Sequence, residues 1–142
     1  MSVIKLLEFL SQQETRYAAD TTMSADFILP NLGAVATTLL GCLGLFAPAR
    51  AASFTSINPV GANGVSEIRA TYGGLFAALG LLCLISQDQA VFTVAGVAWA
   101  GAMVGRVWSI LIDQNFDSKN LGGVAFEGLI AGSLLAAQMS AA

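Results

Sequence analysis

The sequence contains no histidine and only two cysteines in 142 residues. Histidine is the usual base that activates a nucleophilic serine or cysteine, and it is the usual axial ligand of haem or a chlorin. Cys42 and Cys83 lie far apart in apolar stretches, and two isolated thiols do not give the spacing of a zinc or iron–sulfur site. We therefore expect no enzyme and no bound cofactor or metal, while a bound lipid or an adjacent pigment stays compatible with the sequence.

Charged residues are also scarce. They make up 11% of the chain, against about 25% in soluble domains, and hydrophobic residues make up 56%. The mean hydropathy is +0.73. The net charge of −3 includes no basic tract, so we expect neither nucleic acid nor an anionic lipid surface to attract the chain. This composition is typical of a protein embedded in a lipid bilayer.

Four long stretches of the sequence are almost free of charge. Each is long enough to cross a hydrocarbon core of about 30 Å as a helix. The sequence therefore predicts an all-α fold, an integral membrane four-helix bundle over residues 27–142, with both chain ends on one side of the membrane. The predicted spans cover about residues 27–48, 66–87, 89–112 and 121–141.

The segment before the first span, residues 1–26, has a different pattern. Val3, Leu6, Leu7 and Leu10 recur at helical spacing, which predicts an amphipathic helix. Two roles fit such a helix, lying in the membrane interface or docking on a partner protein. The segment is long and acidic, unlike a cleaved signal peptide, so we expect the first span to be retained as an anchor.

The connections between the spans are polar. Residues 48–64 contain two prolines and several turn formers, so we expect the first helix not to continue through them. Residues 86–89 and 113–120 are shorter polar turns.

Small residues at helical spacing mark each predicted span. In lipid, small residues let two helix backbones approach closely, and we expect each row to form a packing seam. Glycine and alanine are, however, common in membrane helices generally. The rows are Gly33, Thr37 and Gly41; Gly73 and Ala77; Gly101 and Gly105; and Gly128 and Gly132.

Three charged residues interrupt the spans at similar depth from one membrane face. Arg69 lies in the second span, Arg106 in the third and Glu127 in the fourth, each in line with small residues. A charge at the bilayer centre costs roughly 2.5 to 3.5 kcal/mol on insertion scales, so pairing inside the bundle is the cheapest arrangement. We expect these three to form a buried cluster with Tyr72 nearby, while Glu67 lies on another side of its helix and complements the helix dipole.

Three roles fit such a cluster. It can lock the register of the helices, it can bind a small molecule or a lipid headgroup, or it can take part in proton or ion movement. One acid and two arginines do not make a continuous relay across the bilayer. Of the two tryptophans, Trp108 lies near a span end, where tryptophan commonly anchors a helix. Trp99 lies nearer mid-span, so we expect it to face lipid or a neighbouring protein, and a pigment contact stays open.

The chain resembles the DUF4345 family of small bacterial membrane proteins in three features. They are a first span that ends in Phe46-Ala47-Pro48, the stretch Glu67-Ile68-Arg69-Ala70-Thr71-Tyr72-Gly73-Gly74-Leu75 after a polar loop, and Phe126-Glu127-Gly128 in the fourth span. The resemblance covers roughly residues 32–135, and residues 67–74 are its most specific part. It implies the four-helix topology but brings no reaction. The residues that it marks as important are Glu67, Arg69, Tyr72, Gly73, Arg106 and Glu127.

Together these patterns favour a non-catalytic, multi-pass protein of a bacterial inner membrane, either cytoplasmic or photosynthetic. We expect an accessory or structural subunit of a larger respiratory or photosynthetic complex, whose partners are the lipid bilayer and other membrane proteins. The alternative is an autonomous protein that binds or transports a small solute or a lipid headgroup through Arg69, Arg106 and Glu127.

Overall fold

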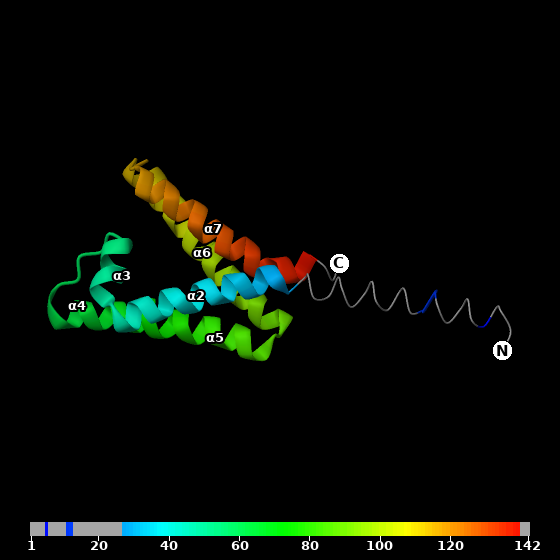
Figure 1. The fold of residues 1–142 in the computed structure, drawn as a ribbon. Coiled ribbons are helices and arrows are strands. Elements are labelled where there is room, and N and C mark those ends of the chain that lie inside the picture. Colours follow the sequence, from blue (N-terminus) through cyan, green and yellow to red (C-terminus); the bar gives the residue numbers. More distant parts are fainter. Residues whose placement is uncertain (1–4, 6–10, 13–26, 140–142) are drawn as a thin grey trace.

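The computed structural model describes residues 5, 11–12 and 27–139 (Figure 1). Every regular element among these residues is helical, which confirms the predicted all-α class. The predicted amphipathic helix lies almost entirely outside the described residues. The elements are α2 (Ile28–Phe46), α3 (Pro48–Phe54), α4 (Gly61–Glu67), the π-helix η1 (Ile68–Leu75), α5 (Phe76–Ser86), α6 (Gln89–Asp113) and α7 (Ser118–Met139).

Three helical stretches are long and apolar enough to cross a membrane, namely Ile28–Phe46, Gly61–Ser86 and Gln89–Asp113. The second stretch joins α4, η1 and α5 in one continuous run. The chain is therefore a multi-pass membrane protein, embedded in the bilayer through these helices. The predicted fourth span corresponds to α7, which is not among the three.

The link after the first span contains more helix than its prolines suggest. α2 ends at Phe46, as expected, but Pro48 then begins the short helix α3. Proline is favourable at the first helical position, because the N–H that it lacks would have no partner there. The second long helix also begins earlier than expected, at Gly61.

Aspartates start the two helices of the last hairpin. The Asp88 side chain accepts a hydrogen bond from the Ala90 backbone N–H at 2.7 Å and caps α6. Asp117 accepts one from the Asn120 N–H at 2.7 Å and caps α7 in the same way. Such caps satisfy backbone donors that the first helical turn leaves free. The short polar turns predicted before both helices thus end in a defined helix start.

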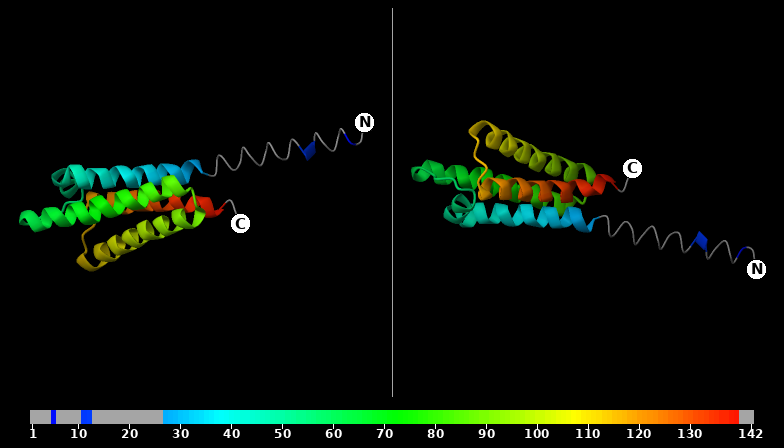
Figure 2. Two further views of the ribbon diagram at one scale, coloured as in Figure 1. Left: turned by 90° about the horizontal axis from the view of Figure 1, so that it is seen from below. Right: turned by 90° about the horizontal axis from the view of Figure 1, so that it is seen from above.

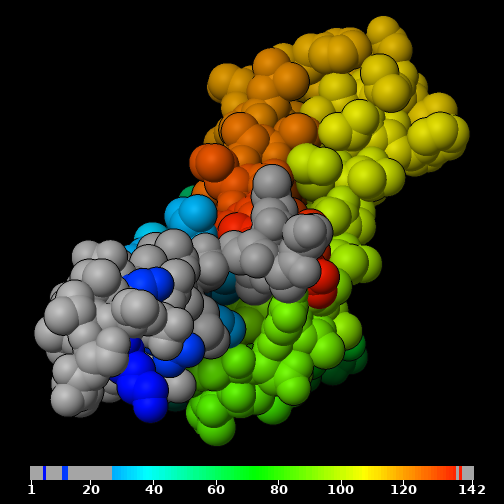
Figure 3. All heavy atoms as spheres, turned by 90° about the vertical axis from the view of Figure 1, so that its right-hand side faces the viewer, coloured from blue at the N-terminus to red at the C-terminus, as the bar shows by residue number. Residues whose placement is uncertain are grey.

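The long helices form two hairpins that cross (Figures 1 and 2). α2 packs against η1 and α5 on one side and against α7 on the other, while α6 packs mainly against α7. The α6–α7 hairpin diverges from the other pair toward its connecting turn, so that it extends to one side of the molecule in Figure 3. α3 lies against α2 and η1 at this same end.

Glycines of α2 make its closest helix contacts. Gly33, Thr37 and Gly41 are buried along one face. A Cβ atom on Gly41 would overlap the backbone of Ala77, and one on Gly73 would lie 2.8 Å from the backbone nitrogen of Leu45. Only residues without a side chain permit this approach, which is how small residues hold helices together in lipid.

The small residues of α6 and the end of α7 lie differently. A Cβ atom added to Gly101, Gly105 or Gly132 would meet no atom within 4 Å, contrary to the packing seams expected there. Gly128 lies between these cases, since a Cβ atom there would be 3.0 Å from the Met103 sulfur. The inward face of α6 consists instead of Phe92, Ala95, Gly96, Trp99 and Ile110.

Trp99 is part of the core and does not face lipid or a neighbouring protein as expected. Its indole N–H donates to the Thr37 hydroxyl at 3.0 Å, and that hydroxyl donates to the Gly33 carbonyl at 2.8 Å. Cys83 also lies in this core, next to Phe92, in agreement with a packing role. Trp108 is 67% exposed near the end of α6, where an interfacial anchor was expected.

Candidate functional site

Arg106 and Glu127 form an ion pair between α6 and α7. The guanidinium Nε donates to one carboxylate oxygen at 3.0 Å, and Nη2 donates to the other at 2.7 Å. This two-point geometry is the strongest form of arginine–carboxylate contact. The Glu127 side chain is only 9% exposed and that of Arg106 is 33% exposed. The pair therefore neutralises a buried acid on one helix with a partly covered base on the other.

Gly123 makes room for the guanidinium. It lies one turn before Glu127 on α7, and a Cβ atom there would be 2.6 Å from Nε of Arg106. The arginine can lie over the α7 backbone only because this position carries no side chain. The sequence patterns did not single out this glycine, although its spacing of four from Glu127 places both on one helix face.

A chain of five aromatic rings runs beside the pair. Neighbouring ring centroids are 5.0 to 6.3 Å apart, mostly edge to face, which is a favourable arrangement. The order is Phe54, Phe126, Trp99, Phe76 and Tyr72, from α3, α7, α6, α5 and η1. Phe126 directly precedes Glu127, and Tyr72 closes the other end of the row through its ring contact with Phe76.

Arg69 does not join this pair. It is exposed, as is Glu67, and neither makes an ion pair with any residue that the structure describes. The reason is the π-helix, whose i→i+5 hydrogen bonds widen the turn and so change which residues face the neighbouring helices. Ile68 thus shares the buried face with Gly73, and Arg69 turns outward. The predicted cluster of three buried charges is a pair in the structure.

The pair offers little to a metal or a reactant. Among the described residues there is no group of three or more His, Cys, Asp or Glu side chains that could hold a metal ion. Both Glu127 oxygens accept from Arg106, so neither is left as a base without a partner. What the arrangement does is fix α6 against α7 at one position.

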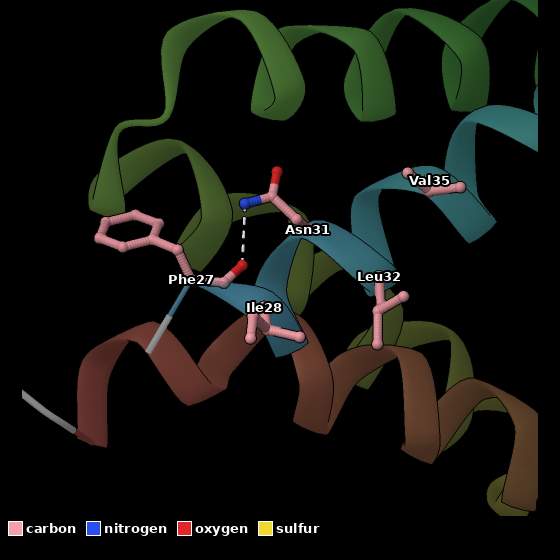
Figure 4. A pocket seen from close by; sticks show the side chains of 5 residues that line it. All are labelled: Phe27, Ile28, Asn31, Leu32 and Val35. Carbon is pink, nitrogen blue, oxygen red and sulfur yellow. Dashed lines mark hydrogen bonds between the residues drawn. The ribbon is translucent and has the colours of Figure 1, made fainter. Parts of the chain in front are cut away.

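The opposite end of the bundle is held by amide side chains. Asn31 and Gln87 exchange two hydrogen bonds of 3.0 and 2.8 Å, and the Gln138 amide donates to the Thr93 hydroxyl. Nearby, Phe27, Ile28, Asn31, Leu32 and Val35 line a shallow hollow on α2 (Figure 4). In Figure 4 the Asn31 amide turns back to the Phe27 carbonyl, a bond of 2.8 Å. The hollow is thus an apolar surface that suits lipid chains.

No curated protein and no solved structure matches the chain. Residues 28–138 match the family described as "Domain of unknown function (DUF4345)". This range runs from the start of α2 to one residue before the end of α7 and includes the Arg106–Glu127 pair. The chain therefore belongs to the DUF4345 family, as its sequence predicted.

Proposed function

We propose that this protein is a non-catalytic accessory subunit of a larger complex in a bacterial inner membrane, of respiratory or photosynthetic type. In this proposal α7 is the fourth membrane span. Its 22 residues measure about 33 Å at 1.5 Å per residue, enough for a core of about 30 Å. Pairing with Arg106 lowers the cost of placing Glu127 in that span.

The observation that carries the proposal is the outer face of α6. Ala98, Gly101, Ala102 and Gly105 form a row of small, exposed residues at spacings of three and four. A flat strip of small residues has no advantage for packing against lipid chains, whereas another membrane helix can approach it closely. The glycines of α2 serve this purpose inside the chain, so the equivalent strip on α6 fits a helix of a partner protein.

The extent to which the helices are buried supports the same proposal. In the most apolar 18-residue stretch of α6, 22% of the stretch is buried inside the protein, compared with 33% for the corresponding stretch of α2. Ala98, Gly101, Ala102 and Gly105 are all exposed, on the hairpin that diverges from the other helices (Figure 1). The Arg106–Glu127 pair then has a structural role, because it holds α6 on α7 where the rest of the chain gives less support.

The test is recovery of the protein from native membranes in mild detergent, followed by native gel electrophoresis and mass spectrometry. We expect it at fixed stoichiometry in a large particle. Changing Gly101 and Gly105 to isoleucine should release it, since the larger side chains would fill the strip, and a Cβ atom at either position meets no atom within 4 Å. The matched control is Gly132→Ile, also in open space but on α7. Recovery of the wild-type protein as a free monomer would contradict the proposal.

A further inference from the structure

Arg69 is an arginine in a membrane-crossing helix for which the described part of the chain supplies no counter-charge. Glu67 is the nearest acid in sequence, but residues two apart on a helix do not face each other. The other arginine of the spans, Arg106, is already held by Glu127. A counter-charge for Arg69 would therefore have to come from outside the described residues.

The depth of Arg69 indicates where that anion is. A core of about 30 Å takes about 20 helical residues, so a span that ends at Ser86 begins near Glu67. Arg69 then lies about 3 Å inside the hydrocarbon boundary, at 1.5 Å per residue. A long arginine side chain bridges that distance easily and places its guanidinium among the headgroups.

The local structure directs the side chain outward. The π-helix turns Ile68 and Gly73 toward α2 and leaves Arg69, Ala70 and Thr71 exposed. Ser66, three residues before Arg69 and also exposed, lies on the same face of the helix. The exposed neighbour on the face of Arg69 is thus a small hydroxyl side chain, which leaves space for a headgroup.

We propose that Arg69 binds the phosphate of a membrane phospholipid at this boundary. Guanidinium presents parallel N–H donors that match phosphate oxygens, and phosphate is the anion that a bilayer offers at this depth. The two arginines then have separate tasks, Arg106 in holding two helices together and Arg69 in holding a lipid. The inference is independent of whether the protein works alone or in a complex.

The test uses the purified full chain, stripped of lipid by detergent exchange and titrated in native mass spectrometry. The probes are dioleoyl phosphatidylglycerol, the phosphate-free dioleoylglycerol and inorganic phosphate. We expect the wild type to prefer the phospholipid over dioleoylglycerol, and Arg69→Gln to weaken phospholipid binding about tenfold, the effect of losing charged hydrogen bonds. Arg69→Lys should keep most of the binding. Arg50→Gln, at another exposed arginine on α3, is the matched control and should not change it.

Several results would overturn the inference. They are equal binding by the wild type and Arg69→Gln, an equal loss in Arg50→Gln, and no preference for the phospholipid over dioleoylglycerol. Displacement of the phospholipid by millimolar inorganic phosphate would reassign the site to a soluble anion. Should Arg69→Gln fail to fold, the comparison of the three probes on the wild type and on Arg69→Lys still decides the question.

Discussion

Removing the Arg106 side chain should destabilise the protein more than removing the Glu127 side chain, because the two side chains are buried to different extents. Arg106→Leu leaves a carboxylate that is 9% exposed without its donors. The loss of one partner of a buried ion pair costs about 3–5 kcal/mol. Glu127→Leu leaves a guanidinium whose side chain is already 33% exposed and can swing toward polar surroundings. Discounted for this exposure, its cost is about 1–2 kcal/mol.

The measurement is reversible unfolding in mixed micelles with increasing sodium dodecyl sulfate, followed by the loss of helical circular dichroism. A variant with both substitutions should be less destabilised than the sum of the two single variants, by about 1–3 kcal/mol, as expected for residues in direct contact. Lys119→Leu is the control, since it removes an exposed cation from the first turn of α7 and should cost less than about 0.5 kcal/mol.

Two results would refute this reasoning. Equal losses for Arg106→Leu and Glu127→Leu would mean that the difference in coverage does not decide the cost. Strict additivity in the double variant would mean that the two side chains do not stabilise each other in the folded protein. In either case the pair would not act as the contact that fixes α6 against α7.

Two further substitutions test the contacts around this pair and in the core, with the same unfolding assay. Gly123→Ala should destabilise the otherwise unchanged protein by about 1 kcal/mol, because the new Cβ atom displaces the paired guanidinium. In a Glu127→Leu background the same substitution should stabilise the protein by up to about 1 kcal/mol through better helix propensity. A gain in stability from Gly123→Ala alone would contradict this. Thr37→Val should cost about 1–3 kcal/mol by leaving the buried Trp99 N–H without an acceptor, whereas Thr38→Val, whose hydroxyl bonds only within α2, should cost little. Similar losses in both threonine variants would argue against the Trp99 bond.

The helices themselves follow from the sequence because the lipid core demands long apolar runs, and such runs are visible by composition. The positions of Arg69, Arg106 and Glu127 along their helices follow from the same count of residues. What could not be predicted is the direction in which Arg69 points, because α-helical periodicity places Arg69 on the face of Gly73, whereas the wider turns of η1 do not. In η1 it is Ile68, instead of Arg69, that lies on the buried face with Gly73.

The glycines show a second limit of the same kind. Gly41 and Gly101 each belong to a row of small residues spaced four apart in an apolar helix, yet one touches the backbone of α5 and the other faces open space. Inside a bilayer, a surface that packs on protein and one that faces lipid have similar composition, because lipid chains are as apolar as leucine. The sequence therefore predicts where helices can approach each other, but not which of these places the chain itself occupies.

The difference between Arg69 and Arg106 follows from their neighbours and not from their depth. Arg69 lies near the start of its long helix and Arg106 near the end of α6, but only α6 has a partner helix that carries a buried acid opposite the arginine and a glycine beneath it. Where such a partner helix exists, the arginine forms an ion pair that stabilises the fold. Where it does not, the arginine is free to interact with molecules around the protein. The same reasoning applies to the unoccupied glycine strip of α6. The surfaces that the fold leaves unused, at η1 and on the outside of α6, are therefore where lipid and partner helices are expected to bind.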